Sequence, residues 1–210
     1  MRSKLSSRVL SVLLALVLVL STLSTMAFAA GEKSDDVVVL YTNDVHCAVD
    51  DNIGYAGLAA YKKEMQAAYN YVALVDCGDS VQGDVIGTLS KGEYLVDIMN
   101  ELGYDFASFG NHEFDYGMDR FLELTEMADF PYISANFNKD GELVFDPYVI
   151  EEIEGVKIAF VGVTTPKTIT SSTPKYFQDD EGNFIYGFMQ DETGEKLYAA
   201  VQSAVDAAIA

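Results

Sequence analysis

The sequence centres on Phe106-Ala-Ser-Phe-Gly-Asn-His-Glu-Phe-Asp-Tyr-Gly117, which joins a short apolar run to a polar cluster. Its first four residues are small or apolar and predict a short buried strand over 106–109. Gly110 then lets the backbone turn sharply. Helical spacing follows over 116–127, so a strand and a helix flank the polar side chains of Asn111, His112 and Asp115. Open α/β sheets place their ligands just past the carboxyl end of a strand.

Apolar runs and helical spacing alternate through the first part of the chain. Buried strands are predicted at 37–41, 72–75, 106–109 and 131–135. Amphipathic helices are predicted between them at 53–69, 94–102 and 116–127. Strand–helix units in this order indicate an α/β fold with a parallel sheet and helices on both of its faces. The continuous apolar run at 37–41 is typical of a strand that is covered on both faces.

The pattern changes in the second part of the chain. Segments 148–153 and 156–163 are separated by Glu154-Gly155 and predict an antiparallel hairpin, so the sheet is mixed or a second sheet is present. We interpret 78–91 as a loop and 164–193 as a long surface excursion, because both lack periodicity. Segment 195–210 has strong helix formers and no terminal cap, which suggests that the polypeptide continues.

Two strand ends upstream carry similar polar groups. Asp44 and His46 follow the first strand, and residues two apart in extended backbone point the same way. Taken alone, this pair is interpreted more simply as a loop carboxylate and a surface imidazole. Asp79 follows Gly78 at the end of the second strand, where glycine leaves room for close approach. Asp76 is as well suited to capping a helix or a turn as to contributing to the site.

The spacing of the three strand ends favours a single site. Asp79 lies 35 residues after Asp44, and Asn111 lies 32 residues after Asp79. Each interval is close to one strand–helix–strand unit of roughly 30 residues. Because parallel strands joined by helices present their carboxyl ends at one edge of the sheet, the three groups are expected to converge there. His112 and Asp115 follow at a spacing that lets the carboxylate orient the imidazole.

These segments resemble the signature blocks of a known family. The first three blocks of the calcineurin-like metallophosphoesterases are similar to Asp44-x-His46, Gly78-Asp79-x-x-Gln82-Gly83 and Gly110-Asn111-His112-Glu113-Phe114-Asp115. More narrowly, the blocks resemble the secreted 5′-nucleotidase branch, which includes 2′,3′-cyclic-nucleotide phosphodiesterases and UDP-sugar hydrolases. The resemblance covers essentially all of residues 31–210. It implies an α/β fold, a β-sandwich flanked by helices, with mostly parallel strands and an antiparallel hairpin.

The resemblance implies a centre of two divalent metal ions. Asp44 and His46 would bind the first ion, and Asn111 would bind the second. Asp79 would bridge both ions. Mixed His, Asp and Asn ligands suit Mn, Zn, Co or Fe and do not choose among them.

The resemblance also implies a catalytic pair, matched here by His112 and Asp115. His112 would stabilise charge or donate a proton toward the leaving oxygen, without binding a metal ion. Asp115 would hold the imidazole in the required tautomer. Glu113 and Phe114 belong to the same motif and are expected only to pack.

The chain departs from the family pattern in its histidines. The family completes its two-metal centre with further His residues and a Gln, and a C-terminal domain holds the nucleoside. This sequence contains two histidines, His46 and His112. We therefore interpret it as the N-terminal part of a longer enzyme, with the substrate-binding residues outside it. Residues 31–210 alone are expected to turn over nucleotides very poorly, and brisk AMP hydrolysis with Mn²⁺ would contradict this interpretation.

Residues 1–30 have the pattern of a secretory signal peptide. Basic residues precede an apolar run at 9–20, and Ala-Phe-Ala at 27–29 matches a small-x-small cleavage site. The apolar run is about a dozen residues, short of the ~20 that span a bilayer. We expect cleavage after residue 29 or 30 and no stable membrane span afterwards. The mature domain, 31–210, would then be secreted, extracellular or associated with a cell wall, or periplasmic if the source has an outer membrane.

The charge balance restricts the partners of the chain. All 33 acidic residues lie beyond residue 30 with 10 of the 13 basic ones, which gives this part a net charge near −23. Such a surface repels nucleic-acid polymers and anionic membranes. A small phosphorylated substrate such as a nucleotide needs a local cationic centre. Because basic residues are sparse, bound metal ions are its expected source.

The two cysteines, Cys47 and Cys77, both lie beside strand ends. They would be able to pair in an exported protein. Two separate, partly buried thiols are the simpler interpretation, and two cysteines do not make a disulfide framework.

Several functions compete for these motifs. We prefer hydrolysis of the 5′-nucleotidase type, followed by a 2′,3′-cyclic-nucleotide phosphodiesterase with 3′-nucleotidase activity or a UDP-sugar hydrolase. A non-catalytic extracellular metal-binding module is the alternative from another class. A purely structural secreted domain leaves Asn-His-Glu-Phe-Asp unexplained. A Gly-His block beyond Ala210 would favour the enzyme, whereas a genuine stop there would favour the binding module.

Overall fold

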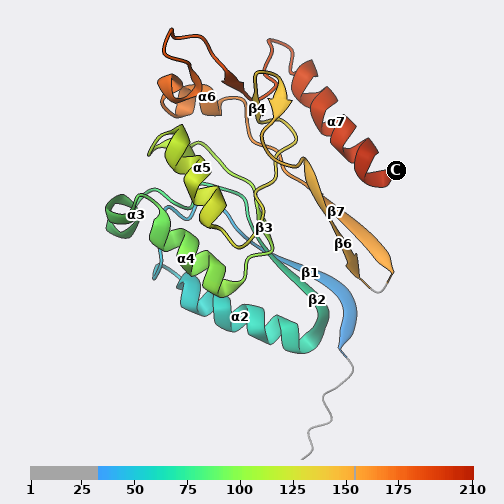
Figure 1. Cartoon of the computed structure of the whole chain (residues 1–210). Coiled ribbons are helices and arrows are strands. Elements are labelled where there is room, and N and C mark those ends of the chain that lie inside the picture. The colour runs from blue at the N-terminus through green and yellow to red at the C-terminus, as the bar shows by residue number, and fades with distance from the viewer. Residues whose placement is uncertain (1–32, 154) are drawn as a thin grey trace, which may run out of the picture. The chain divides into compact units, whose positions relative to one another are not determined.

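A computed structural model describes residues 33–153 and 155–210 (Figure 1). Asp35–Ala210 form one compact unit. The predicted signal peptide, 1–30, lies outside the described residues. Among the helices that are described, none is long and apolar enough to cross a membrane.

Three strands form the sheet that carries the candidate site, namely β1 (Ser34–Thr42), β2 (Tyr69–Asp76) and β3 (Phe106–Ala107), in that order. β2 and β3 are parallel, as predicted, with Val75 opposite Phe106. The strand predicted at 131–135 is reduced to a parallel bridge between Ala107 and Tyr132. Pro131, the residue before Tyr132, has no N–H to extend a ladder.

Helices α2 (Gly54–Ala68), α4 (Glu93–Leu102) and α5 (Met118–Met127) cover one face of this sheet (Figure 1). Their positions confirm the three helices predicted at 53–69, 94–102 and 116–127. In α4 the buried residues Leu95, Val96 and Met99 recur at helical spacing and face the core. α4 ends at Gly103, whose φ of 68° is the left-handed conformation that favours glycine at helix ends.

A short helix, α3 (Val85–Ser90), lies inside the segment predicted as a loop at 78–91, so that prediction is wrong. The Asp84 carboxylate accepts a hydrogen bond from the Val85 N–H at 3.3 Å and caps the first turn. Gly87 is buried within the helix, where a Cβ would overlap Cys47 Sγ. Because its buried position is a glycine rather than a large apolar residue, the segment shows no helical periodicity in the sequence.

The other face of the parallel sheet is covered by the predicted antiparallel hairpin, formed by β6 (Tyr148–Ile153) and β7 (Val156–Val161). Val149 and Phe160 of the hairpin pack against a cluster formed by Ala73, Val75, Phe106 and Ile133. α7 (Glu195–Ile209), in the segment predicted as helical, contacts both hairpin strands (Figure 1). The prediction of helices on both faces of the parallel sheet is wrong, because strands cover its second face. The β-sandwich flanked by helices that the family resemblance implied is confirmed.

Aromatic rings fill the core under the helices, and those that are fully buried are Phe109, Phe114, Phe121, Phe137, Phe177 and Phe188. Phe114 makes ring contacts with the other five members of this group. Two of the six, Phe177 and Phe188, belong to the segment predicted as a surface excursion at 164–193. That prediction is wrong, because the segment closes the core.

The same segment adds short elements around these rings. They are α6 (Thr168–Ser171), a 3-10 turn at Pro174–Phe177 and β8 (Tyr186–Gly187). β8 joins β4 (Asn138–Lys139) and β5 (Glu142–Leu143) in a small sheet of order β5-β4-β8. Elements of two to four residues are too short to show hydrophobic periodicity, so the sequence gives no sign of them.

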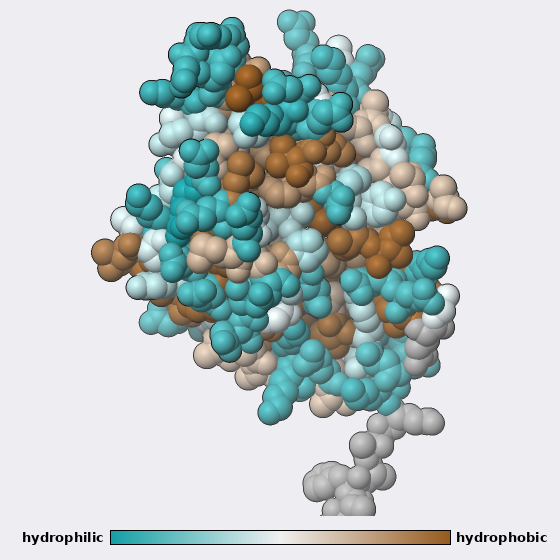
Figure 2. Space-filling view, in the orientation of Figure 1, coloured by the Kyte–Doolittle hydropathy of each residue, from teal (hydrophilic) through white to brown (hydrophobic). Residues whose placement is uncertain are grey.

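One strand is more exposed than its sequence predicts. Val37, Val39 and Tyr41 of β1 are 40%, 42% and 69% exposed, so the expectation that this strand is covered on both faces is wrong for the described residues. Figure 2 shows that hydrophilic residues predominate on the visible surface and that hydrophobic ones form separate patches. This matches the acidic composition.

Candidate metal centre

Backbone hydrogen bonds hold the first and second strand ends side by side. The Asp44 N–H donates to the Gly78 carbonyl at 3.0 Å, and the His46 N–H donates to the Asp79 carbonyl at 2.9 Å. These bonds continue the pairing of the chain beyond the ends of β1 and β2. They therefore hold the predicted ligands Asp44 and His46 next to Asp79.

The third strand end, which follows β3, lies in close backbone contact with the loop that follows β2. Gly78 has a φ of +98°, and a Cβ there would overlap the backbone nitrogen of Gly110. At Gly83 a Cβ would overlap the carbonyl of His46. Glycine is required at both positions because the loops touch through their backbones.

Three of the predicted ligands adopt a backbone conformation that is uncommon outside glycine. Asp44, His46 and Asp79 have φ values of 58°, 46° and 59°. A non-glycine residue in the left-handed region persists only where its surroundings hold it, and such residues gather at functional sites. The local strain therefore coincides with the candidate ligands.

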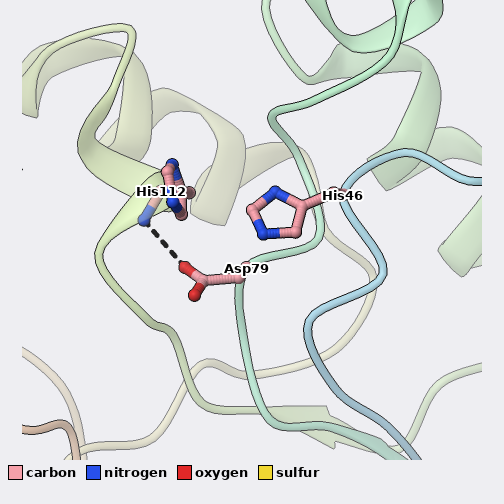
Figure 3. Close-up of side chains that lie close together, drawn as sticks. All are labelled: His46, Asp79 and His112. Carbon is pink, nitrogen blue, oxygen red and sulfur yellow. Dashed lines mark hydrogen bonds between the residues drawn. The ribbon is translucent and has the colours of Figure 1, made fainter.

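The centre of the site contains His46, Asp79 and His112, which arrive from three different loops (Figure 3). One ligand atom of each lies within 4.8 Å of those of the other two. The two imidazole rings are 4.6 Å apart at 74°, and the His112 N–H donates to Asp79 Oδ1 at 2.8 Å. Imidazole nitrogens and a carboxylate in this arrangement fit a divalent transition metal.

The His46 ring is oriented by a backbone carbonyl. Its Nδ1 lies 3.0 Å from the Gln82 carbonyl, which can only accept, so Nδ1 carries the proton. Nε2 lies 3.0 Å from Asp44 Oδ1, so the two atoms that could bind a metal ion lie next to each other. A ligating histidine is commonly fixed in this way through its other nitrogen. The sequence contained no sign that Gln82 acts through its main chain.

Asp44 and Asn111 lie at the edges of this group. The Asp44 side chain is 63% exposed and reaches the centre through its contact with His46. Asn111 directly precedes His112 and begins the 3-10 turn His112–Phe114. The structure thus brings Asp44, His46, Asp79 and His112 together by direct contacts, while Asn111 is placed beside them by its position in the chain.

His112 and Asp115 form the pair expected from their spacing. His112 Nδ1 lies 2.7 Å from Asp115 Oδ2, which leaves Nε2 as the free ring nitrogen. Partial burial on its own would lower the pKa of His112, but the hydrogen bond and the charge of Asp115 outweigh this and raise the pKa above its usual value. The carboxylates of Asp79 and Glu113 add to the rise. The ring is therefore held protonated to a higher pH than a free imidazole.

Replacing Asp115 with asparagine is expected to lower the pKa of His112 in the metal-free chain, because the charge that raises it is removed. An NMR titration of the imidazole protons measures this change. Because the pKa of His112 is higher in the folded chain than in the unfolded chain, protonation of His112 stabilises the fold. This stabilisation is fully present when the pH is below the pKa of the unfolded chain, and it is lost as the pH rises through the pKa of the folded chain. An unchanged pKa would show that Asp115 does not control the ring. Asp119→Asn, on the exposed surface of α5, is the matched control.

Two buried carboxylates lie beneath the ligands. Asp76 accepts hydrogen bonds from Thr42 Oγ1 at 2.6 Å, Ser80 Oγ at 2.7 Å and the Gly78 N–H at 3.0 Å. It thus has the turn-capping role that the sequence left open. Burial raises the pKa of Asp76 despite these bonds. Burial, followed by the charge of Asp76, raises the pKa of Glu113 to about 7.

Glu113 is buried, as its expected packing role requires, and its carboxylate also accepts backbone hydrogen bonds from both neighbouring loops, which was not expected. Phe114 packs as expected and is fully buried. No pattern in the sequence distinguishes the two roles.

The cysteines are separate thiols, as the simpler interpretation predicted. Cys47 is buried and Cys77 is exposed, and neither forms a disulfide. Burial is the main cause that raises the pKa of Cys47 to about 11. Its thiol donates to the Ser80 carbonyl at 3.3 Å and so supports the same loop.

Known proteins share this sequence pattern. The chain is 34% identical over 171 residues to a snake venom 5′-nucleotidase from Gloydius brevicauda, covering 72% of this chain and 29% of that protein. It is 35% identical over 174 residues to Protein UshA from Yersinia enterocolitica, covering 75% of this chain and 32% of that protein. The chain therefore spans only about a third of the length of these relatives.

Solved structures share the fold and connect it to a family. The NAD nucleotidase NadN of Haemophilus influenzae superimposes with a TM-score of 0.67 at 26% identity, covering 81% of this chain and 31% of that one. The calcineurin-like phosphoesterase YfkN of Bacillus subtilis does so with a TM-score of 0.62 at 27% identity, covering 81% of this chain and 58% of that one. A family model for the calcineurin-like phosphoesterases matches residues 37–200. This chain belongs to the calcineurin-like phosphoesterase family.

Proposed function

We propose that this chain supplies the metal-binding part of a hydrolase that cleaves phosphate esters of nucleotides, of the 5′-nucleotidase type. The observation that carries this proposal is that the proposed ligands His46 and Asp79 converge within 4.8 Å of each other and of His112, the proposed proton donor. Relatives named as 5′-nucleotidases support the substrate class. Because the chain spans about a third of such relatives, the activity is proposed for a protein that completes the site.

The proposed ligands divide between two divalent ions, which are Mn, Zn, Co or Fe. Asp44 and His46 would hold one ion, Asn111 would hold the other, and Asp79 would be a ligand to both. Such ions, when bound, lower the pKa of a water molecule and neutralise phosphate oxygens. The chain has few basic residues, so this centre is also the proposed binding point for the anionic substrate.

His112 acts on the substrate side of the centre in this proposal. Its Nδ1 is engaged by Asp115 at 2.7 Å, so Nε2 is the nitrogen available to a leaving oxygen or a phosphate oxygen. The raised pKa favours the protonated form of the ring, which proton donation requires. Asp115 holds the ring in place and stabilises its charge.

We further propose that the protein is exported. The predicted signal peptide at 1–30 would direct export, and a venom enzyme among the relatives fits this location. The strongly acidic surface agrees with a small-molecule substrate rather than a nucleic-acid polymer.

Replacing His112 with alanine separates the proposed catalytic role from metal binding. In a longer protein that completes the site, hydrolysis with Mn²⁺ would be followed as phosphate released from AMP, adenosine monophosphate formed from 2′,3′-cyclic AMP, and UMP formed from UDP-glucose. There His112→Ala is expected to lower the rate of hydrolysis roughly 10²- to 10⁴-fold while metal content stays near that of the wild type.

Three outcomes decide the assignment. Loss of one ion per chain in His112→Ala would make His112 a ligand and overturn its role as proton donor. In a longer protein that completes the site, no metal-dependent hydrolysis by the wild type, together with normal Mn²⁺ binding, would favour the extracellular metal-binding module. Faster cleavage of cyclic AMP or UDP-glucose than of AMP would favour the phosphodiesterase or the sugar-nucleotide hydrolase.

A further inference from the structure

Glu113 is a buried carboxylate in the middle of the candidate site. It follows His112 in the 3-10 turn His112–Phe114 and is 2% exposed. None of the four ion pairs found among the described residues includes it. A carboxylate in such a position is costly unless hydrogen bonds satisfy it.

Three backbone N–H groups satisfy this carboxylate. Oε2 accepts from Asp79 at 2.9 Å and from Gly110 at 2.7 Å, and Oε1 accepts from Ser80 at 2.8 Å. Asp79 and Ser80 follow β2, whereas Gly110 follows β3. The carboxylate thus joins the two strand ends that carry the proposed ligands.

The bonds form a closed arrangement around Asp79. Its N–H donates to Glu113, and its Oδ1 accepts from the N–H of His112, the residue before Glu113. Asp79 is therefore held at both its main chain and its side chain by one 3-10 turn. Its φ of 59° is a conformation that persists only when neighbouring groups hold it.

We propose that Glu113 is a positioning residue that sets the place of the Asp79 carboxylate relative to His112 and thereby determines metal affinity. An apolar residue of similar size would fill the same space but would leave three N–H groups unpaired. The effect on metal affinity rests on the proposed metal centre, whereas the hydrogen bonds of Glu113 do not depend on it. Groups that orient metal ligands typically change affinity by ~10- to 100-fold when they are altered.

The test is Glu113→Gln, which keeps the size of the side chain. If the amide oxygen takes the place of Oε2, it still accepts from Asp79 and Gly110, but the amide NH₂ then faces the Ser80 N–H. We expect Mn²⁺ affinity, measured by calorimetry, to fall ~10- to 100-fold, with a far-UV circular dichroism spectrum like that of the wild type. Glu123→Gln, the same substitution at an exposed site on α5, is the matched control and should leave affinity unchanged.

A second variant covers the case in which Glu113→Gln does not fold. Glu113→Asp keeps the carboxyl group but withdraws it by one methylene, so that it no longer reaches both loops. We expect weaker Mn²⁺ binding in this variant as well. Wild-type affinity in either folded variant would overturn the proposal.

Hydrogen exchange of the metal-free chain separates this inference from the proposed function. We expect the Ser80 amide to be protected in the wild type and to lose protection in Glu113→Gln, while amides of α4 keep theirs. A uniform loss of protection across the domain would show a merely structural role and overturn the proposal. If the wild type binds no Mn²⁺ but shows this local pattern, the metal centre fails and the positioning of Asp79 by Glu113 stands.

Discussion

Replacing Asp79 with asparagine is expected to weaken Mn²⁺ binding by about 100-fold or more, beyond the range typical of residues that only orient ligands. Asp79 contributes the carboxylate of the central group and is the proposed bridge between the two ions. Asparagine keeps the shape, tolerates the left-handed backbone and can still accept from the His112 N–H. The substitution therefore removes charge from the centre with little change to the fold. Isothermal titration calorimetry measures the effect.

The control for Asp79→Asn is Asp97→Asn, which removes an exposed carboxylate from α4. It should leave Mn²⁺ affinity unchanged, which excludes a general effect of the acidic surface. Binding by Asp79→Asn within tenfold of the wild type would mean that this carboxylate is not a ligand. The remaining proposed ligands would then have to hold the ions without a bridge.

Replacing Phe114 with alanine is expected to lower the free energy of unfolding by about 3–5 kcal/mol. Phe114 is fully buried and contacts five other aromatic rings of the core. Its removal leaves a cavity under the turn that carries His112 and Glu113. For a domain of this size the loss corresponds to a decrease in Tm of roughly 6–20 °C. Thermal and urea unfolding followed by circular dichroism would measure it.

Phe184→Ala provides the same substitution at a site that is 53% exposed. Its effect should stay within about 0.5 kcal/mol, as is usual for surface positions. Equal losses in the two variants would contradict a core centred on Phe114. A stable Phe114→Ala protein would mean that the turn is held by its hydrogen bonds alone.

The sequence predicted those helices and strands in which apolar side chains recur at helical spacing or in a continuous run. The apolar runs of β1 and β2 and the helical spacing of α2, α4 and α5 each extend over several residues, so the pattern of apolar residues identifies them. The intervals between Asp44, Asp79 and Asn111 then placed these residues at one edge of the sheet. Because parallel topology brings strand ends together, residues far apart in the chain were assigned to a common site before their contacts were known.

Features that depend on single contacts were not predictable. α3 is short and buries a glycine, and the elements between Thr168 and Gly187 are too short for periodicity. The aromatic residues Phe177 and Phe188 pack in the core only because distant segments meet there. The role of Glu113 depends on backbone N–H groups of two other loops, and no side-chain pattern records them.

The direct measurement of the central claim is the position of Mn²⁺ in crystals of residues 31–210, located by anomalous diffraction. A peak in contact with His46 Nε2 and the Asp79 carboxylate, with His112 Nδ1 still bonded to Asp115, is the predicted result. A peak elsewhere on the acidic surface, or no peak at saturating Mn²⁺, would show that the three strand ends do not build a metal centre.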